Sequence, residues 1–197
     1  MEDNTPEYWD KEWDKRIIPN GGVIGNNQKV RILIQEIWSR PQLMNAMKLE
    51  IGCGPATHAR HICKMCHNFG KGYLGIDTSQ KAIDEAEGSG LHVMNESIYS
   101  FETDLRFDAF FFFDVLEHIK DHESVALKIK ELGKKEFSVL INVPLYRSNL
   151  EENGGFERGV DIQVINNFFH TTGVKNFNHK IYGIRGYPYM FAEGIKK

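Results

Sequence analysis

Three positions in the first half of the chain have the residue types and spacing of a ligand-binding turn. Glu50 lies near the end of a short apolar segment, and Gly52 and Gly54 follow with one residue between them. Glycine lacks a Cβ, so it adopts positive φ readily and lets a ligand approach the main chain. Pro55 presets φ for a helix start, so residues 47–57 predict a strand, a tight turn and a helix. That helix would direct free N–H groups and a partial positive charge towards the turn.

A second acid, Asp77, ends the next predicted strand and lies 23 residues after Gly54 (77 − 54). That interval is close to the one at which an acid meets the ribose hydroxyls of a nucleotide bound on a glycine turn. A carboxylate can accept hydrogen bonds from both hydroxyls. The competing interpretation is a cap for the helix over 80–87, but Ser79 and Thr78 are better placed for that role. Asp77 is therefore predicted to bind a ribose.

The residues of the glycine turn also indicate which class of nucleotide it would bind. A dinucleotide fingerprint has a third glycine three positions after the second, where this chain has Thr57, and a P-loop needs Gly-Lys-Ser or Gly-Lys-Thr, which the chain lacks. Glu50, two residues before the turn, would repel a pyrophosphate but suits an ammonium or sulfonium group. These charges favour S-adenosylmethionine as the cofactor, with S-adenosylhomocysteine as its product.

The hydrophobic pattern predicts the framework that must position these residues. Short apolar segments alternate with amphipathic ones, which indicates a parallel sheet with right-handed helical crossovers. The predicted fold is α/β, a single Rossmann-like three-layer α/β/α domain whose mostly parallel seven-stranded sheet ends in an antiparallel C-terminal hairpin. Strands are expected at 47–51, 73–76, 91–94, 107–113, 137–143, 174–184 and 187–195. Helices are expected at 28–40, 57–68, 80–87, 122–132 and 161–171, and loops at 17–27, 69–72 and 146–160.

The N-terminal segment 1–16 is acidic, and its spacing lets Tyr8, Trp9 and Trp13 share one side of a short helix. Two interpretations stay open for it. One is an amphipathic helix packed on the domain surface. The other is a lid whose aromatic rings close over the bound ligand, with Trp9 among the cofactor-binding residues, because aromatic rings attract a sulfonium.

Three segments of the chain resemble the successive motifs of the class I S-adenosylmethionine-dependent methyltransferases. They are Leu-Glu-Ile-Gly-Cys-Gly-Pro-Ala at 49–56, Leu-Gly-Ile-Asp-Thr-Ser at 74–79, and the segment 107–119 with its Asp-Val-Leu-Glu-His sequence. The resemblance covers residues 46–145 and is closest to the small stand-alone members with that last sequence. Ala56 departs from the family, which often has a third glycine there. The resemblance implies a methyltransferase domain over 41–197, preceded by a helical arm or lid over 1–40.

The resemblance also implies which residues bind the cofactor. The implied positions are Glu50 for the amino group, Gly52, Cys53 and Gly54 for the amino-acid end, Asp77 for the ribose, Thr78, Glu96 and Ser97 for the adenine, and Asp114 for the methionine moiety. Glu96 has a competing interpretation as part of the solvated surface.

Methyl transfer from a sulfonium is an in-line displacement of a group that is already activated, so positioning and desolvation supply much of the catalysis. An acceptor with a proton to lose would need a base, and His118 is the candidate by family position. The alternative for His118 is a structural role at a helix start. We expect a small-molecule acceptor, because the loop 146–160 and the aromatic arm leave few residues for a separate substrate domain.

Two other classes of function stay open. The first is a non-catalytic subunit that binds S-adenosylmethionine and serves a protein partner. The second is an NAD-dependent oxidoreductase, which Glu50 and Thr57 disfavour.

Composition excludes several classes of protein. The chain has 197 residues, 41% hydrophobic content and a formal net charge of −3, which suits one globular domain and gives no basic field for extended nucleic-acid binding. Three cysteines and no apolar segment at 1–16 argue against a disulfide framework and secretion, so we expect a cytoplasmic protein without a membrane span. The histidines and cysteines at 58–67 have no second cysteine pair elsewhere, so we expect packed thiols and surface histidines rather than a metal site.

Overall fold

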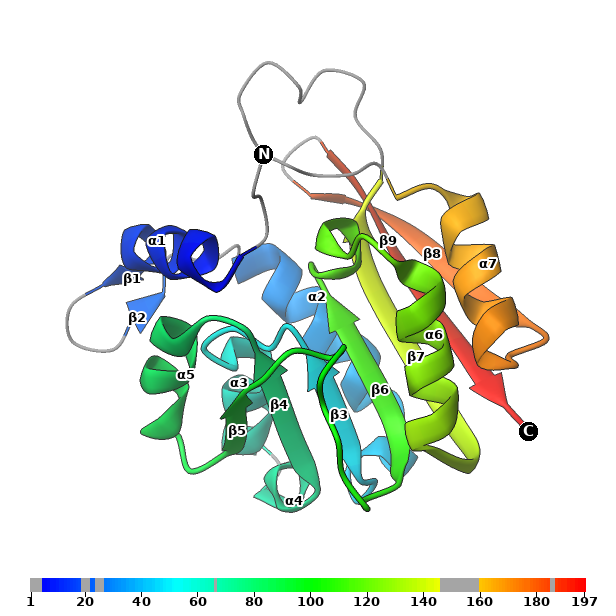
Figure 1. Cartoon of the computed structure of the whole chain (residues 1–197), viewed down its shortest axis with the longest axis horizontal. Helices are drawn as coiled ribbons and strands as arrows, with labels where there is room; N and C mark the ends of the chain where they lie inside the picture. Colours follow the sequence, from blue (N-terminus) through cyan, green and yellow to red (C-terminus); the bar gives the residue numbers. More distant parts are fainter. Residues whose placement is uncertain (1–4, 19–21, 24–26, 66, 146–159, 185–186) are drawn as a thin grey trace. The chain divides into compact units, whose positions relative to one another are not determined.

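The computed structural model describes residues 5–18, 22–23, 27–65, 67–145, 160–184 and 187–197 (Figure 1). The chain forms two compact units, Met1–Phe101 and Glu102–Lys197. The predicted loop at 146–160 lies outside the described residues except for its last position. No helix in the described part of the chain is long and apolar enough to cross a lipid bilayer.

The first unit is built on three parallel strands, β3 (Lys48–Ile51), β4 (Tyr73–Asp77) and β5 (His92–Asn95). Its helices are α1 (Pro6–Arg16), α2 (Asn27–Trp38), the short η1 (Pro41–Leu43), α3 (Thr57–Met65), α4 (His67–Lys71) and α5 (Gln80–Glu87). A small antiparallel pair, β1 (Ile17–Ile18) and β2 (Gly22–Val23), follows α1. Because β3, β4 and β5 run in parallel, their carboxyl ends lie at the same edge of this unit.

In the second unit, β6 (Phe107–Phe113) and β7 (Gly133–Pro144) are parallel, while β9 (Tyr187–Lys196) pairs antiparallel with both β7 and β8 (Phe177–Ile184). The helices of this unit are η2 (Leu116–His118), α6 (His122–Leu132) and α7 (Ile162–Thr172). Helices α6 and α7 pack side by side (Figure 1). The seven strands have the order β5-β4-β3-β6-β7-β9-β8 in one mixed sheet. This confirms the predicted sheet, mostly parallel with antiparallel C-terminal strands.

Two local predictions for the first unit were wrong. Residues 17–27 were expected to be a loop, but they contain the β1–β2 pair, because turn residues also suit a hairpin connection. Residues 69–72 were also expected to be a loop, but 69–71 complete α4.

Helix α3 begins at Thr57, which confirms the predicted start of this helix, because the preceding Ala56 has a φ of +52°, which is not helical. Strand β7 starts four residues earlier than its predicted start at 137. A bulge between Phe107 and Ala109 lets Phe107 pair with Gly133 while Ala109 pairs with Ser138.

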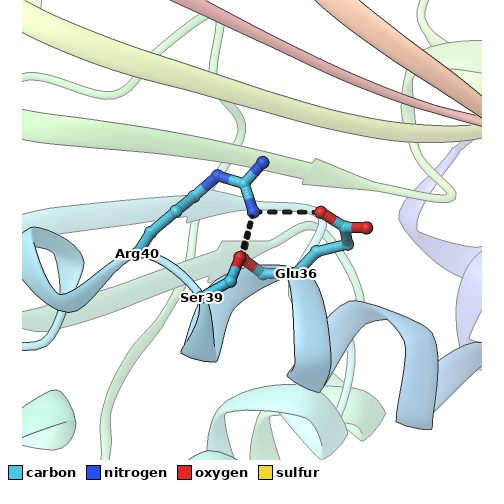
Figure 2. A network of polar contacts seen from close by, with 3 residues as sticks. All are labelled: Glu36, Ser39 and Arg40. Atoms are coloured by element: carbon cyan, nitrogen blue, oxygen red, sulfur yellow. Dashed lines mark hydrogen bonds and ion pairs between the residues drawn. The ribbon is translucent and has the colours of Figure 1, made fainter.

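The C-terminus of α2 is stabilised by a polar network (Figure 2). The Nη1 atom of Arg40 donates to Oε2 of Glu36 and to Oγ of Ser39, at 3.0 Å each, and also to the main-chain oxygen of Glu36. The hydroxyl of Ser39 donates to that same main-chain oxygen at 2.8 Å. A cation at a helix C-terminus satisfies carbonyl groups that have no helical partner. Pro41 then begins η1, which confirms the predicted stop of this helix before residue 41.

A buried lysine holds the start of β3 in place. Lys48 is fully buried, and its Nζ donates to the main-chain oxygens of Leu43 at 3.1 Å and Ala46 at 2.6 Å. The same Nζ lies 4.6 Å from the ring centroid of Phe69 in α4. These bonds compensate part of the cost of burying the charge. They tie the strand that carries Glu50 to the segment before it.

Candidate functional site

The glycine turn after β3 keeps the backbone in the left-handed region at three alternate positions. The φ angle is +65° at Gly52, +52° at Gly54 and +52° at Ala56. Glycine adopts this conformation without strain, whereas an alanine there costs roughly 1–2 kcal/mol. Ala56, where the family often has glycine, therefore has a backbone conformation that favours glycine. Helix α3 begins directly after it, so its first N–H groups follow the turn.

Asp77 connects the end of β4 to the glycine turn. Its Oδ2 accepts from the N–H of Gly54 at 2.7 Å, and its Oδ1 accepts from the N–H of Ser79 at 2.9 Å. The hydroxyl of Ser79 caps α5 by accepting from the N–H of Ala82 at 3.2 Å, which confirms the predicted cap. A carboxylate can accept about four hydrogen bonds, so Asp77 keeps acceptor capacity for two ribose hydroxyls.

Burial raises the pKa of Asp77 above its ordinary value of 3.8. The two N–H bonds to its carboxylate oppose that rise, and the negative charges of Glu50 and Asp10 add to it. Three carboxylates therefore act on one another around the turn. A positively charged ligand would relieve their repulsion.

We expect the raised pKa of Asp77 to appear in the pH dependence of stability of the protein without ligand. As the pH falls, the folded state takes up this proton before the unfolded state does. The free energy of unfolding of the wild type should therefore rise relative to that of Asp77→Asn as the pH falls through the folded pKa, and the difference should be constant below the unfolded value. Urea unfolding from about pH 7 to about pH 3.5 measures this difference. A difference that does not change with pH would contradict the assignment.

Glu50 in β3 is 2% exposed and is approached from two neighbouring elements. The hydroxyl of Tyr73 in β4 donates to Oε2 at 2.7 Å, and Nδ1 of His58 in α3 lies 3.8 Å from Oε1. Burial, and then the charge of Glu50, raise the pKa of Tyr73. Burial also raises the pKa of the Cys53 thiol, with Asp77 and Glu50 adding to the effect. Tyr73 and Cys53 therefore stay protonated.

The predicted adenine positions follow β5 and connect to Asp77 through the main chain. The main-chain oxygen of Asp77 accepts from the N–H of Glu96 at 3.0 Å and from Nδ2 of Asn95 at 3.1 Å. Oε1 of Glu96 accepts from the N–H of Ser97 at 3.1 Å and from the hydroxyl of Ser100. The structure thus brings the predicted positions at 50–54, 77–78 and 96–97 to the carboxyl ends of β3, β4 and β5. The adenine contacts of Glu96 and Ser97 stay predictions.

Trp13, one of the three aromatic residues named in the predicted arm, packs on the glycine turn. A Cβ on Gly54 would lie 2.6 Å from Cζ2 and 2.9 Å from Cη2 of this indole, so the ring packs directly on the glycine. Trp9, the residue chosen from the sequence, makes an edge-on contact with Tyr8, with ring centroids 5.2 Å apart. The spacing of Tyr8, Trp9 and Trp13 predicted an aromatic face on this helix, but spacing does not tell which ring contacts the turn. The cofactor contact of Trp9 stays a prediction.

Acidic residues hold α1 against the start of α5 (Figure 1). Oδ1 of Asp10 accepts from the hydroxyl of Ser79 at 2.5 Å and from the N–H of Lys81 at 3.1 Å. Nζ of Lys81 lies 3.0 Å from Oδ1 of Asp14. An anion at a helix N-terminus is favoured by the free N–H groups and the helix dipole. Asp10 contacts Ser79, which lies two residues after the predicted ribose-binding Asp77, and is a residue that sequence reasoning missed.

In the second unit, Asp114 and His118 follow β6. Asp114 has a φ of +54°, and its N–H donates to the main-chain oxygen of Asn142 at 2.9 Å. A non-glycine residue in this conformation costs roughly 1–3 kcal/mol. Helix η2 places His118 half-buried, with its Nε2 4.0 Å from Oε1 of the buried Glu117. The roles of Asp114 and His118 stay predictions.

Within the described ranges, no group of three or more His, Cys, Asp or Glu side chains is arranged to hold a metal ion. Cys63 lies half-buried in α3, whereas Cys66 lies outside those ranges.

The chain was compared with protein-family models, curated protein sequences and solved structures. Residues 49–141 match a family model described as a methyltransferase domain. No curated protein sequence matches the chain.

Solved structures with the same fold include three methyltransferases. Magnesium protoporphyrin IX methyltransferase (ChlM) from Synechocystis PCC 6803 with bound SAH is 15% identical, covers 98% of this chain and 98% of its own, and has a TM-score of 0.75. The N-methyltransferase NodS from Bradyrhizobium japonicum WM9 in complex with S-adenosyl-L-homocysteine is 13% identical over 95% of this chain and 97% of its own, with a TM-score of 0.70. The plantazolicin methyltransferase BamL, in complex with a triazolic desmethylPZN analog and SAH, is 13% identical over 86% of this chain and 90% of its own, with a TM-score of 0.62.

Proposed function

We propose that the chain is a class I S-adenosylmethionine-dependent methyltransferase that transfers a methyl group in line from S-adenosylmethionine to a small-molecule acceptor. The observation that carries the proposal is the pair of buried carboxylates, Glu50 and Asp77, beside a left-handed glycine turn. Two of the similar structures are named for small molecules, magnesium protoporphyrin IX and plantazolicin, which supports this class of acceptor.

The residues around the turn fit S-adenosylmethionine in charge and in hydrogen bonding. When bound, this cofactor supplies a methyl group activated by a positively charged sulfur. Glu50 offers a buried negative charge for the amino group, and Asp77 offers free acceptor positions for the ribose hydroxyls. Gly52 has no side chain that would block the amino-acid end, whereas the Trp13 indole packs on Gly54. The chain's contribution is therefore to bind and orient the reacting groups.

For an acceptor that loses a proton, we propose His118 as the base. The support is its family position and the carboxylate of Glu117, with the closest approach of the two side chains at 4.0 Å. A carboxylate near an imidazole favours the protonated form that a base generates. An acceptor whose nucleophile carries no proton would not need this residue.

We propose α1 as a lid on the cofactor, acting through Trp13. An indole over a desolvated cation contributes about 1–2 kcal/mol, so Trp13→Ala should lower the affinity for S-adenosylmethionine about tenfold and the affinity for uncharged-sulfur S-adenosylhomocysteine by less. Deleting residues 1–16 should act in the same direction. Isothermal titration measures both affinities, with Trp38→Ala, an exposed tryptophan on α2, as the matched control. Unchanged or higher affinity in Trp13→Ala would contradict the lid.

Two measurements in sequence test the function. Isothermal titration with S-adenosylhomocysteine should show binding at a single site per chain. Methyl-labelled S-adenosylmethionine, incubated with small-molecule, lipid and protein acceptors, should then give labelled product in the small-molecule pool. Label in protein or lipid would overturn the proposed acceptor class. Binding without label in any pool would favour the non-catalytic subunit.

A further inference from the structure

The orientation of Glu50 depends on a residue of the neighbouring strand. The hydroxyl of Tyr73 donates to Oε2 of Glu50 at 2.7 Å, and both side chains are 2% exposed. In the β3–β4 register, Glu50 lies opposite Gly75, and Tyr73 lies two residues before that glycine. A Cβ on Gly75 would lie 2.8 Å from the Tyr73 hydroxyl oxygen and 2.8 Å from Sγ of Cys53. The absence of a side chain at Gly75 therefore leaves the space in which the hydroxyl meets the carboxylate.

Groups from β4, from α3 and from the glycine turn face Glu50. Tyr73 bonds one carboxylate oxygen from β4, and Nδ1 of His58 lies 3.8 Å from the other oxygen from α3. The neutral thiol of Cys53 and the carboxylate of Asp77 are close enough to interact with it electrostatically. Among these contacts, the Tyr73 bond has the short length of a charge-assisted hydrogen bond. It therefore fixes the direction in which the carboxylate points.

We propose that Tyr73 is a positioning residue for the amino group of the cofactor, acting through Glu50. This inference rests on the proposed function. The carboxylate holds the ammonium by charge and hydrogen bonding, and that contact is strong when the carboxylate is already oriented before the ligand arrives. Tyr73 itself does not touch the cofactor.

The test compares two ligands that differ in the α-amino group. One is S-adenosylhomocysteine, and the other is its analogue that lacks this group. The wild type should bind S-adenosylhomocysteine more tightly. The dissociation constant of the analogue divided by that of S-adenosylhomocysteine reports the contact with Glu50. Tyr73→Phe should lower that ratio about fivefold to tenfold by weakening S-adenosylhomocysteine, while the affinity for the deamino analogue changes less than about twofold. Tyr73→Leu removes the same hydroxyl with another shape and should give the same pattern.

Two further variants make the result decisive. Glu50→Gln should lower the ratio at least as far as Tyr73→Phe does. Tyr182→Phe, a half-buried tyrosine on β8 in the second unit, should leave the ratio unchanged. Far-UV circular dichroism gives the folded fraction of each variant, so that dissociation constants refer to folded protein.

Each outcome separates the inference from the proposed function. If the wild type binds neither ligand, the proposed function fails. If the wild type binds both ligands equally, or if Tyr73→Phe weakens both by the same factor or neither, the positioning role is overturned and the proposed function stands.

Discussion

Asp77→Asn is expected to lower the affinity for S-adenosylhomocysteine by a factor of about one hundred or more, because two charge-assisted hydrogen bonds to ribose hydroxyls contribute about 1.5–3 kcal/mol each. The change also affects the protein itself. Both carboxylate oxygens accept main-chain N–H groups, from Gly54 at 2.7 Å and from Ser79 at 2.9 Å. An asparagine has one oxygen and one NH₂ group, so one of these N–H groups would face a donor. The turn and the start of α5 would lose a shared acceptor as well as a ligand contact.

Isothermal titration measures this loss, and a matched control separates it from a general effect of removing an acid. Asp84→Asn makes the same chemical change on the exposed side of α5, where Oδ1 accepts from Nε2 of Gln80 at 2.7 Å. This control should bind S-adenosylhomocysteine as the wild type does. An Asp77→Asn protein that binds within about threefold of the wild type would show that Asp77 does not hold the ribose.

Gly54→Ala is expected to destabilise the protein by about 2–4 kcal/mol, from the left-handed backbone and from overpacking together. The φ of Gly54 is +52°, and a Cβ there would lie 2.6 Å from Cζ2 of Trp13. The added methyl group would therefore displace the indole and loosen α1 from the turn. Affinity for S-adenosylhomocysteine should fall as well, because the cofactor must approach the same main chain.

Urea unfolding measures the destabilisation, and two variants divide it into its causes. Gly88→Ala adds a methyl group to a glycine with a φ of −66° and with nothing within 4 Å of the new atom, so it should change stability little. Adding Trp13→Ala to Gly54→Ala should recover the steric part but not the backbone part, since the two residues are in contact. A double variant whose stability loss equals the sum of the single losses would contradict the packing of Trp13 on Gly54.

The central elements of the fold were predictable because their signals are local. The segment 107–113 is apolar at almost every position, and the structure makes it β6 with the same bounds. Helix α5 was predicted over 80–87, because a hydroxyl cap precedes it and glycine follows it. Local signals failed where one residue type serves two conformations. Turn residues at 17–27 were compatible with a loop and with a hairpin.

The sequence by itself determined the type of site: an acid before a Gly-x-Gly turn and a second acid at the end of the next strand. Periodicity, glycine conformation and charge act over a few residues, so they can be read directly from the order of amino acids. The tertiary structure decided which side chains complete the site. The contacts of Trp13 with Gly54, Asp10 with Ser79 and Tyr73 with Glu50 join residues that are 41 (54 − 13), 69 and 23 positions apart in the sequence. Such contacts depend on strand register and on how a helix is rotated when it packs, and neither is set by neighbouring residues in the chain.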